Sequence, residues 1–273
     1  MTVRSAVVLG PGGVVGTAWL AGLAAGLRRE GVDLGTADLI VGTSAGAIVG
    51  AILARGEDLD RLATLPAPTG PLDGARPDPA KLAEVFATLG DTGIDRAEAT
   101  RRVGRLAVAA ATGAEEAVIA RMRSLVGGAE WPSRPLLIPA VDAETGEAVV
   151  WDRQGAASLP EAVAASTAFP ATAPPITIGG RRYIDGALRA GTNLDLAGDA
   201  ETLIVAEPMA HSFGPSDAGE GERIVVRLVP DAEAIEAIGP DVGDRAAWAP
   251  AYQAGVRQAE DAAERIRDCS AIR

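Results

Sequence analysis

The sequence contains very few of the residues from which metal and disulfide sites are built. Its 273 residues include one cysteine, Cys269, and one histidine, His211. A single cysteine excludes an internal disulfide and a cysteine zinc cluster, and a single histidine excludes a site that needs two imidazoles. We expect no metal site and no cofactor. Aromatic residues make up only 3% of the chain, so the core must consist of alanine, valine, leucine and isoleucine.

Basic residues are scarce relative to acidic ones. The chain has 25 Lys and Arg against 37 Asp and Glu, which gives a net charge of −12. A chain this acidic lacks the electrostatic footprint of a protein that binds nucleic acid or anionic lipid surfaces. We expect no nucleic-acid partner and at most peripheral contact with a membrane. The composition fits a reducing cytosol, which predicts a cytoplasmic location, and it does not indicate the oligomeric state.

A long uninterrupted hydrophobic run is also missing. Arg4 precedes an apolar stretch that extends to about Leu27, as in an export signal, but glycines and a proline at residues 10–16 interrupt it. A strand, a loop and a buried helix explain this stretch better, and no later segment resembles a membrane span.

The pentapeptide Gly42-Thr43-Ser44-Ala45-Gly46 has the G-x-S-x-G pattern of a nucleophile elbow. The apolar run 38–41 before it predicts a buried strand, and the apolar segment 47–54 after it predicts a buried helix. In this context a serine occupies a tight strand-to-helix turn, and Gly42 and Gly46 leave room for its backbone. Ser44 is therefore the candidate nucleophile, although a turn of small residues without chemistry has the same composition.

A glycine-rich loop precedes the elbow. The run 5–9 predicts the first strand of a parallel sheet, residues 10–16 form the loop, and a helix is expected over about 17–30. A dinucleotide-binding loop would need a third glycine where Val15 stands, so nucleotide binding is disfavoured. We favour an oxyanion hole, to which the loop supplies one donor and the N–H of Ala45 another.

The remaining chain alternates strand-like and helical segments, which predicts an α/β protein with a mostly parallel sheet. Residues 60–134 contain a Pro/Gly-rich loop over 66–71 and 73–79, then helical patterns near 80–89, 96–111 and 114–126. Asp95 and Thr112 are possible start signals. We interpret this block as a helical insertion or cap, within a single domain over 1–273, although scaffold helices fit equally well.

Further strands and one well-marked helix follow this block. Hairpins are predicted over 136–151 and 176–184, strands over 202–206 and 223–229, and a final helix over about 245–267. Ser158 and Glu161 have the spacing of a capping box at a helix start. The second hairpin ends on Asp185-Gly186-Ala187. Asp185 by itself reads as a turn residue, but within hydrogen-bond reach of Ser44 it would serve as general base.

Three motifs in this order resemble the bacterial patatin-like phospholipases. They are the loop Pro11 to Gly16, the pentapeptide Gly42 to Gly46, and Asp185-Gly186-Ala187. The approach to Asp185, over 166–175 and the Gly179-Gly180 hairpin, is also similar. The resemblance covers about residues 5–54 and 135–207 and leaves out the 60–134 block. It implies a three-layer sandwich around the sheet.

The resemblance also implies roles for individual residues. Ser44 would be the nucleophile and Asp185 the base of a Ser-Asp dyad, with backbone N–H groups of Gly12, Gly13 and Val14 binding the oxyanion. Gly16, Gly42, Gly46 and Gly186 would be the motif glycines. The implied reaction is hydrolysis of a lipid or other acyl ester through an acyl-serine intermediate.

Two departures from the family pattern bear on the substrate. Pro11 stands where the family usually has glycine, and it has no N–H to donate. Val15 stands where a basic residue is common, which makes a neutral ester more plausible than a phosphate headgroup.

Other interpretations remain open. Ser44, Asp185 and His211 occur in the chain order of an α/β-hydrolase triad, although the elbow comes early and His211 lies in a loop rich in glycine and proline. A non-catalytic lipid-binding or protein-binding relative is a third possibility, which the intact Ser44 and Asp185 disfavour.

Overall fold

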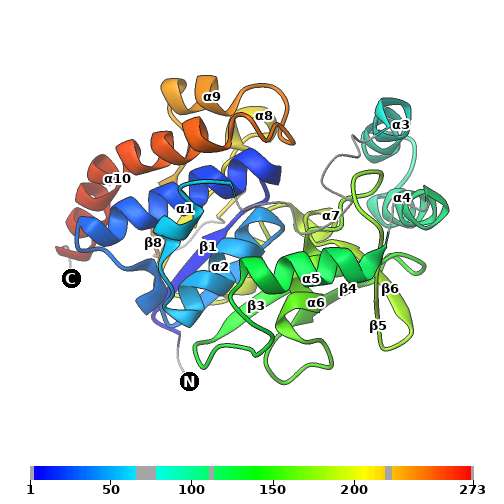
Figure 1. The fold of residues 1–273 in the computed structure, drawn as a ribbon, viewed down its shortest axis with the longest axis horizontal. Helices are drawn as coiled ribbons and strands as arrows, with labels where there is room; N and C mark the ends of the chain where they lie inside the picture. The colour runs from blue at the N-terminus through cyan, green and yellow to red at the C-terminus, as the bar shows by residue number, and fades with distance from the viewer. Residues whose placement is uncertain (1–2, 66–77, 111–113, 219–222, 272–273) are drawn as a thin grey trace. The chain divides into compact units, whose positions relative to one another are not determined.

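The computed structural model describes residues 3–65, 78–110, 114–218 and 223–271 (Figure 1). The chain divides into two compact units. The first unit comprises residues 1–66, 132–137 and 191–273, and the second comprises residues 67–131 and 138–190. Expected loop residues 66–71 and 73–77, and the possible start signal Thr112, lie outside the described residues.

The first unit contains a parallel sheet. Its strand order is β8-β7-β1-β2-β3, where β3 contributes only its first two residues. The strands are β1 (Ser5–Leu9), β2 (Leu39–Gly42), β7 (Thr202–Ala206), β8 (Ile224–Leu228) and β3 (Leu136–Asp142). Leu9 pairs with Gly42 on one side and with Ala206 on the other, so β1, β2 and β7 end side by side. The loops that follow these strands therefore meet at one edge, which we call the carboxyl edge.

Small residues allow the helices of the first unit to pack closely. α1 packs against both α2 and α10. A Cβ added at Gly22 would lie 2.0 Å from the Tyr252 carbonyl oxygen, and one at Gly255 would lie 2.2 Å from that of Trp19. Helix backbones thus touch where bulkier residues would separate them. The helices are α1 (Gly13–Arg29), α2 (Ala45–Arg55), α8 (Ala210–Phe213), α9 (Ala232–Ile238) and α10 (Trp248–Ala271).

The sheet of the first unit also has an apolar face covered by a short 3₁₀ helix over Leu194–Ala197. Ala6 and Val8 of β1 pack there with the alternate residues Leu203 and Val205 of β7, as the period-2 pattern of a strand requires.

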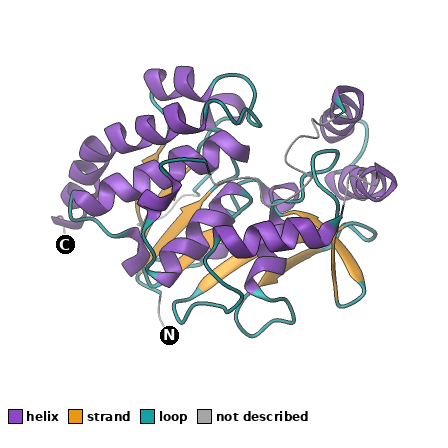
Figure 2. Cartoon of the chain, viewed as in Figure 1, coloured by secondary structure: helices purple, strands orange, loops and turns teal. Residues whose placement is uncertain are grey.

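The second unit contains antiparallel strands in the order β5-β6-β3, with β4 on the other side of β3. Through β3, the strands of the chain form a mixed sheet of eight strands, mostly parallel and flanked by helices (Figure 2). The predicted α/β fold with a mostly parallel sheet is confirmed. The additional strands and helices are β4 (Ala148–Trp151), β5 (Ile176–Ile178), β6 (Arg181–Asp185), α3 (Pro79–Leu89), α4 (Arg96–Ala110), α5 (Glu115–Leu125), α6 (Leu159–Ser166) and α7 (Ala187–Ala190).

The helices predicted within 78–126 are present and help to form the core of the second unit. Val85 of α3 and Val103 of α4 belong to one buried cluster with Val141 of β3 and Ile184 of β6. The Asp95 carboxylate accepts a bond of 2.8 Å from the Glu98 N–H, as expected of a helix start. α3 and α4 therefore pack in the same core cluster as the strand that ends at Asp185.

Most predicted elements match the structure, with one informative difference. Both hairpins form, and the Ser158 N–H donates to the Glu161 carboxylate at 2.7 Å at the start of α6. The first helix, expected from residue 17, begins at Gly13. The glycine loop is shorter than predicted because α1 already begins at Gly13, although Gly13 itself has a positive φ, and the carbonyl of Val242 accepts a hydrogen bond from the N–H of Val14 at that end.

Candidate active site

Ser44 occupies the turn between β2 and α2 in an unusual backbone conformation. Its φ is 53° and its ψ is −115°, one of three positive φ values among non-glycine residues in the described ranges. Such a conformation costs about 1–3 kcal/mol and persists only where surrounding structure imposes it. The residue is 8% exposed. A strained serine at a strand-to-helix turn is the geometry that the G-x-S-x-G pattern predicts.

Backbone contacts of the motif glycines impose this conformation. A Cβ at Gly46 would lie 2.0 Å from the Leu9 carbonyl oxygen, closer than any real side chain approaches. A Cβ at Gly42 would lie 2.4 Å from the Gly46 carbonyl oxygen. Residues 42 and 46 must therefore lack a side chain for the turn to form.

The structure brings the glycine loop and the elbow together at the carboxyl edge. The N–H of Thr43 donates to the Leu9 carbonyl at 3.0 Å, and the N–H of Gly46 donates to the Gly10 carbonyl at 3.2 Å. Gly12 caps α1, and Gly16 lies in the first turn of that helix. The N-termini of α1 and α2 thus both begin at this edge, where their free N–H groups can face an anion.

The predicted oxyanion donors differ in availability. The N–H of Val14 donates to the Val242 carbonyl at 2.8 Å, and the N–H of Val15 reaches the same oxygen at 3.3 Å. Val14, expected to bind the oxyanion, is engaged with the chain itself. The N–H groups of Gly12, Gly13 and Ala45 donate to no other group within the described residues. These three remain the candidate donors.

Two segments of the first unit hold the loop in place. A Cβ at Gly12 would lie 2.9 Å from Pro208 Cβ, and one at Gly13 would lie 2.6 Å from the Val242 carbonyl oxygen. Gly13 also has a φ of +62°, which side-chain-bearing residues rarely adopt. Any larger residue at these positions would displace the loop.

Asp185 ends β6 in the second unit and is 1% exposed. Asp185 pairs with Ala140 of β3, and its backbone N–H donates to the Ala168 carbonyl at 3.1 Å. One carboxylate oxygen accepts a bond of 2.8 Å from the N–H of Ala187, where α7 begins. A Cβ at Gly186 would lie 2.2 Å from the Pro139 carbonyl oxygen, which explains the glycine. The side chain of Asp185 is thus held in a fixed direction.

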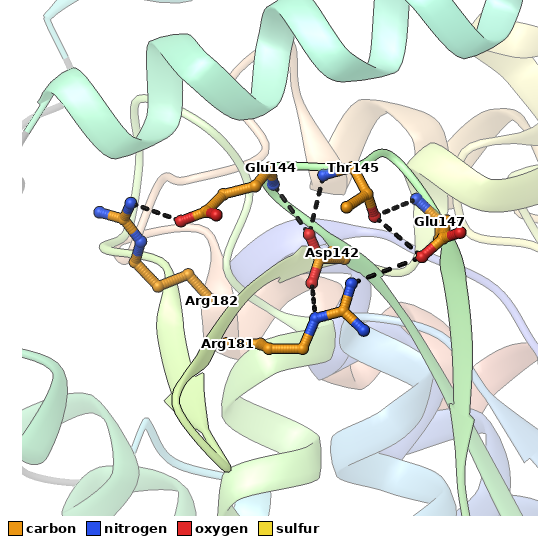
Figure 3. Close-up of polar contacts among 6 residues, drawn as sticks. All are labelled: Asp142, Glu144, Thr145, Glu147, Arg181 and Arg182. Atoms are coloured by element: carbon orange, nitrogen blue, oxygen red, sulfur yellow. Dashed lines mark hydrogen bonds and ion pairs between the residues drawn. The ribbon is translucent and has the colours of Figure 1, made fainter.

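A buried aspartate, which the sequence did not single out, anchors the start of the same strand. Asp142 accepts bonds from the N–H groups of Glu144 and Thr145 at 2.9 and 2.8 Å, and its other oxygen pairs with Arg181 Nε at 2.8 Å (Figure 3). Burial raises the pKa of Asp142, but these hydrogen bonds and the Arg181 charge outweigh it, so the pKa lies below the ordinary value. The turn and β6 are thereby tied together.

A third buried acid, Glu207, lies at the carboxyl edge of the first unit. Glu207 follows β7, is 3% exposed, and forms an ion pair with Arg227. Sequence reasoning did not find it. The available signal was its position, because Glu207 directly follows an apolar strand, as Gly10 and Thr43 do.

His211 lies on α8 with an exposed side chain. It forms no hydrogen bond with the described part of the chain. Across the described ranges, no three His, Cys, Asp or Glu side chains gather in a way that could hold a metal ion.

The elbow, the glycine loop and the Asp-Gly turn agree with a match to a known family. The model of the patatin-like phospholipase family matches residues 7–197, which is most of the chain. The chain therefore belongs to the patatin-like phospholipase family. Membership supports lipid acyl hydrolase activity, and a lipid is the substrate that the family implies. No curated protein matches the chain.

Two solved structures are similar. VipD from Legionella pneumophila is 14% identical, with a TM-score of 0.44, and the match covers 97% of this chain and 67% of VipD. The type III effector ExoU is 19% identical, with a TM-score of 0.36, and the match covers 96% of this chain and 53% of ExoU. The chain thus spans about two thirds of VipD and about half of ExoU.

No helix among the described residues is both long enough and apolar enough to cross a bilayer.

Proposed function

We propose that the chain hydrolyses carboxylic acyl esters of lipids, with Ser44 as nucleophile and Asp185 as general base. The observation that carries this proposal is the conformation of Ser44, with its φ of 53° at the turn between β2 and α2. Backbone strain of this kind is retained at functional sites, and here glycine contacts on both sides impose it. Family membership supplies the reaction class.

The proposed reaction has two halves. The Ser44 hydroxyl oxygen attacks the ester carbonyl carbon while Asp185 accepts the hydroxyl proton. The tetrahedral intermediate then expels the alcohol, which takes that proton from Asp185, and an acyl-serine remains. A water molecule that gives a proton to Asp185 then attacks the acyl carbon, and the Ser44 oxygen leaves with that proton from Asp185, which releases the fatty acid and restores the Ser44 hydroxyl and the Asp185 carboxylate. No metal or cofactor takes part.

Backbone donors stabilise the intermediate. The N–H groups of Gly12, Gly13 and Ala45 lie at the adjoining N-termini of α1 and α2, and they donate to no other group in the described chain. One such donor is worth about 10²–10³ in turnover in a well-studied protease. Because a carboxylate is a weaker base than imidazole, these donors carry a large share of the rate.

A neutral ester is the substrate that the loop favours. Val15, at the position where relatives often have a basic side chain, is fully buried in α1 and brings no positive charge to the loop. A phosphate headgroup would thus lack a cationic partner at this position.

A Ser44-Asp185-His211 triad is the alternative enzyme mechanism, and a non-catalytic lipid-binding or protein-binding relative is the alternative without activity. The His211 side chain lies exposed on the short helix α8, which favours the dyad over the triad.

The test is hydrolysis of p-nitrophenyl esters and of phospholipid vesicles by the wild type, Ser44→Ala, Asp185→Asn and the double variant. The proposal predicts activity that both single variants abolish, with a double variant little worse than either, because the two residues act as a unit. An active Ser44→Ala variant, or losses that multiply, would contradict it. Faster hydrolysis of phospholipids than of neutral esters would contradict the substrate preference alone.

A further inference from the structure

Glu207 is a buried carboxylate at the carboxyl edge for which the proposed reaction assigns no part. It follows β7, whose last residue, Ala206, pairs with Leu9 and accepts a bond of 2.9 Å from the N–H of Gly10. The backbone of Glu207 therefore lies beside the start of the glycine loop. Glu207 is only 3% exposed, which is rare for an acid, and a charge buried to this extent needs partners that compensate for the lost hydration.

Those partners satisfy both carboxylate oxygens. One oxygen accepts bonds from the Thr192 hydroxyl at 3.0 Å and from the Ser216 N–H at 2.9 Å, and the other pairs with the Arg227 guanidinium. Arg227 also donates to the Ser216 carbonyl at 2.7 Å. We call Thr192, Glu207, Ser216 and Arg227 the Glu207 cluster. Within the cluster, the negative charge of Glu207 is balanced by Arg227, and both carboxylate oxygens have partners.

The cluster is connected to the elbow through Thr192 and its neighbour. The Thr43 hydroxyl donates to the Thr192 carbonyl at 3.4 Å, and the Asn193 side-chain amide donates to the Thr43 hydroxyl oxygen at 3.0 Å. Thr43 is fully buried and directly precedes Ser44. Thr192 thus links the Glu207 carboxylate to the residue before the nucleophile, and Asn193 supports the same residue.

The cluster also contacts the glycine loop. The Thr192 hydroxyl lies 3.3 Å from the place of a Cβ at Gly10, and Pro208, next to Glu207, packs against Gly12 and Gly16. A shift of Glu207 or Thr192 would therefore move both the loop and the elbow.

Stability alone is a weak reason for such an ion pair. Removing two charges from water offsets most of their mutual attraction, and a well-packed apolar pair is often at least as stable. The location supplies a better reason, since donors and nucleophile must be held within about 0.5 Å of their working geometry.

We propose that Glu207 is a positioning residue, which with Thr192 and Arg227 holds the glycine loop and the Thr43–Ser44 turn so that their N–H groups face one oxyanion. This role rests on the proposed function of Ser44. Glu207 acts through Thr192 and Pro208 rather than by touching the substrate.

The test is steady-state kinetics on a soluble p-nitrophenyl ester with Glu207→Gln and Thr192→Val. Gln keeps the shape but leaves Arg227 without its counter-charge, and Val keeps the volume but removes the hydroxyl that joins Glu207 to the turn. If either variant lets the glycine loop or the Thr43–Ser44 turn shift, kcat should fall by about 10–100-fold while KM stays within about threefold. Thr192→Ser, which keeps the hydroxyl, should restore kcat to within about threefold of the wild type.

Two comparisons distinguish positioning from general destabilisation. Asp231→Asn removes a carboxylate–arginine pair, with Arg257, in the same unit and should leave kcat unchanged. The Glu207→Gln/Thr192→Val double variant should be little worse than either single one, because both break the same connection.

The outcomes separate this proposal from the proposed function. If Ser44-dependent hydrolysis is present but folded Glu207→Gln and Thr192→Val both keep wild-type kcat, or raise only KM, the positioning role is wrong. If Glu207→Gln does not fold, Thr192→Val and Thr192→Ser decide the question by the same criteria. If the wild type shows no hydrolysis that depends on Ser44, the proposed function fails, and the role of Glu207 fails with it.

Discussion

The N–H of Gly46 donates a hydrogen bond of 3.2 Å to the carbonyl oxygen of Gly10. This bond joins the turn after β2 to the loop after β1, two segments that contain the candidate nucleophile and the candidate oxyanion donors. It forms only because residue 46 has no side chain, since a Cβ there would meet the Leu9 carbonyl oxygen at 2.0 Å.

Gly46→Ala should therefore destabilise the fold. Backbone cannot give way as a flexible side chain can, so we expect a loss of at least about 1–3 kcal/mol in the free energy of unfolding, measured by urea denaturation. Gly50→Ala, in the same helix, is the matched control. Its Cβ would meet only side-chain methyl groups at 3.2 Å or more, and alanine favours the helix. Equal stability of the two variants would contradict the packing argument.

Gly13→Ala should lower turnover. The new Cβ would lie 2.6 Å from the Val242 carbonyl oxygen and would strain a φ of +62°, so the loop must shift. Because the loop donors act on the developing oxyanion, kcat should fall by about 10²-fold while KM changes little. Gly31→Ala is the control, since it has the same kind of positive φ at an open site. A rise in KM alone would show that the loop only binds substrate.

His211→Ala distinguishes the dyad from the triad. The dyad predicts activity within a few-fold of the wild type, because the exposed His211 then takes no part in the proton transfer. A triad predicts a loss of several orders of magnitude. The kcat/KM of the purified variant on a soluble ester decides between them, and a folded but inactive protein would refute the dyad.

Asp142→Asn tests how much the Asp142 carboxylate, which joins the turn at Glu144 and Thr145 to Arg181 of β6, contributes to stability. The lowered pKa of Asp142 means that its charged form stabilises the fold above pH of about 4 and that this contribution is lost as pH falls through the folded-state pKa. The variant should be less stable by about 1–2 kcal/mol at pH 7, with the exposed Arg181 contributing little after solvent screening. Urea midpoints of the two proteins should converge as the pH is lowered toward 2. A difference that does not depend on pH would contradict the prediction.

The sequence indicates the candidate site residues more readily than the contacts that hold them in place. Ser44, the glycine loop and Asp185 stand out because their turns need special residues at fixed spacing. The donors could not be sorted from the sequence, because Val14 is engaged by a carbonyl from residue 242, more than 200 positions away. That bond also explains why α1 begins at Gly13 rather than near residue 17.

Two of the three buried acids were missed for a similar reason. Asp142 and Glu207 are buried by strand pairing with distant parts of the chain, and their partners Arg181 and Arg227 look like ordinary surface arginines in the sequence. Periodicity finds strands and helices, but it does not indicate which charged side chains the fold will bury.

Trapping the acyl-enzyme tests the central claim most directly. The wild type is mixed with a p-nitrophenyl ester, quenched in acid within the burst phase, digested and examined by mass spectrometry. The account predicts the acyl group on Ser44, and no adduct in Ser44→Ala. An adduct on another residue, or release of product by Ser44→Ala at the wild-type rate, would contradict it.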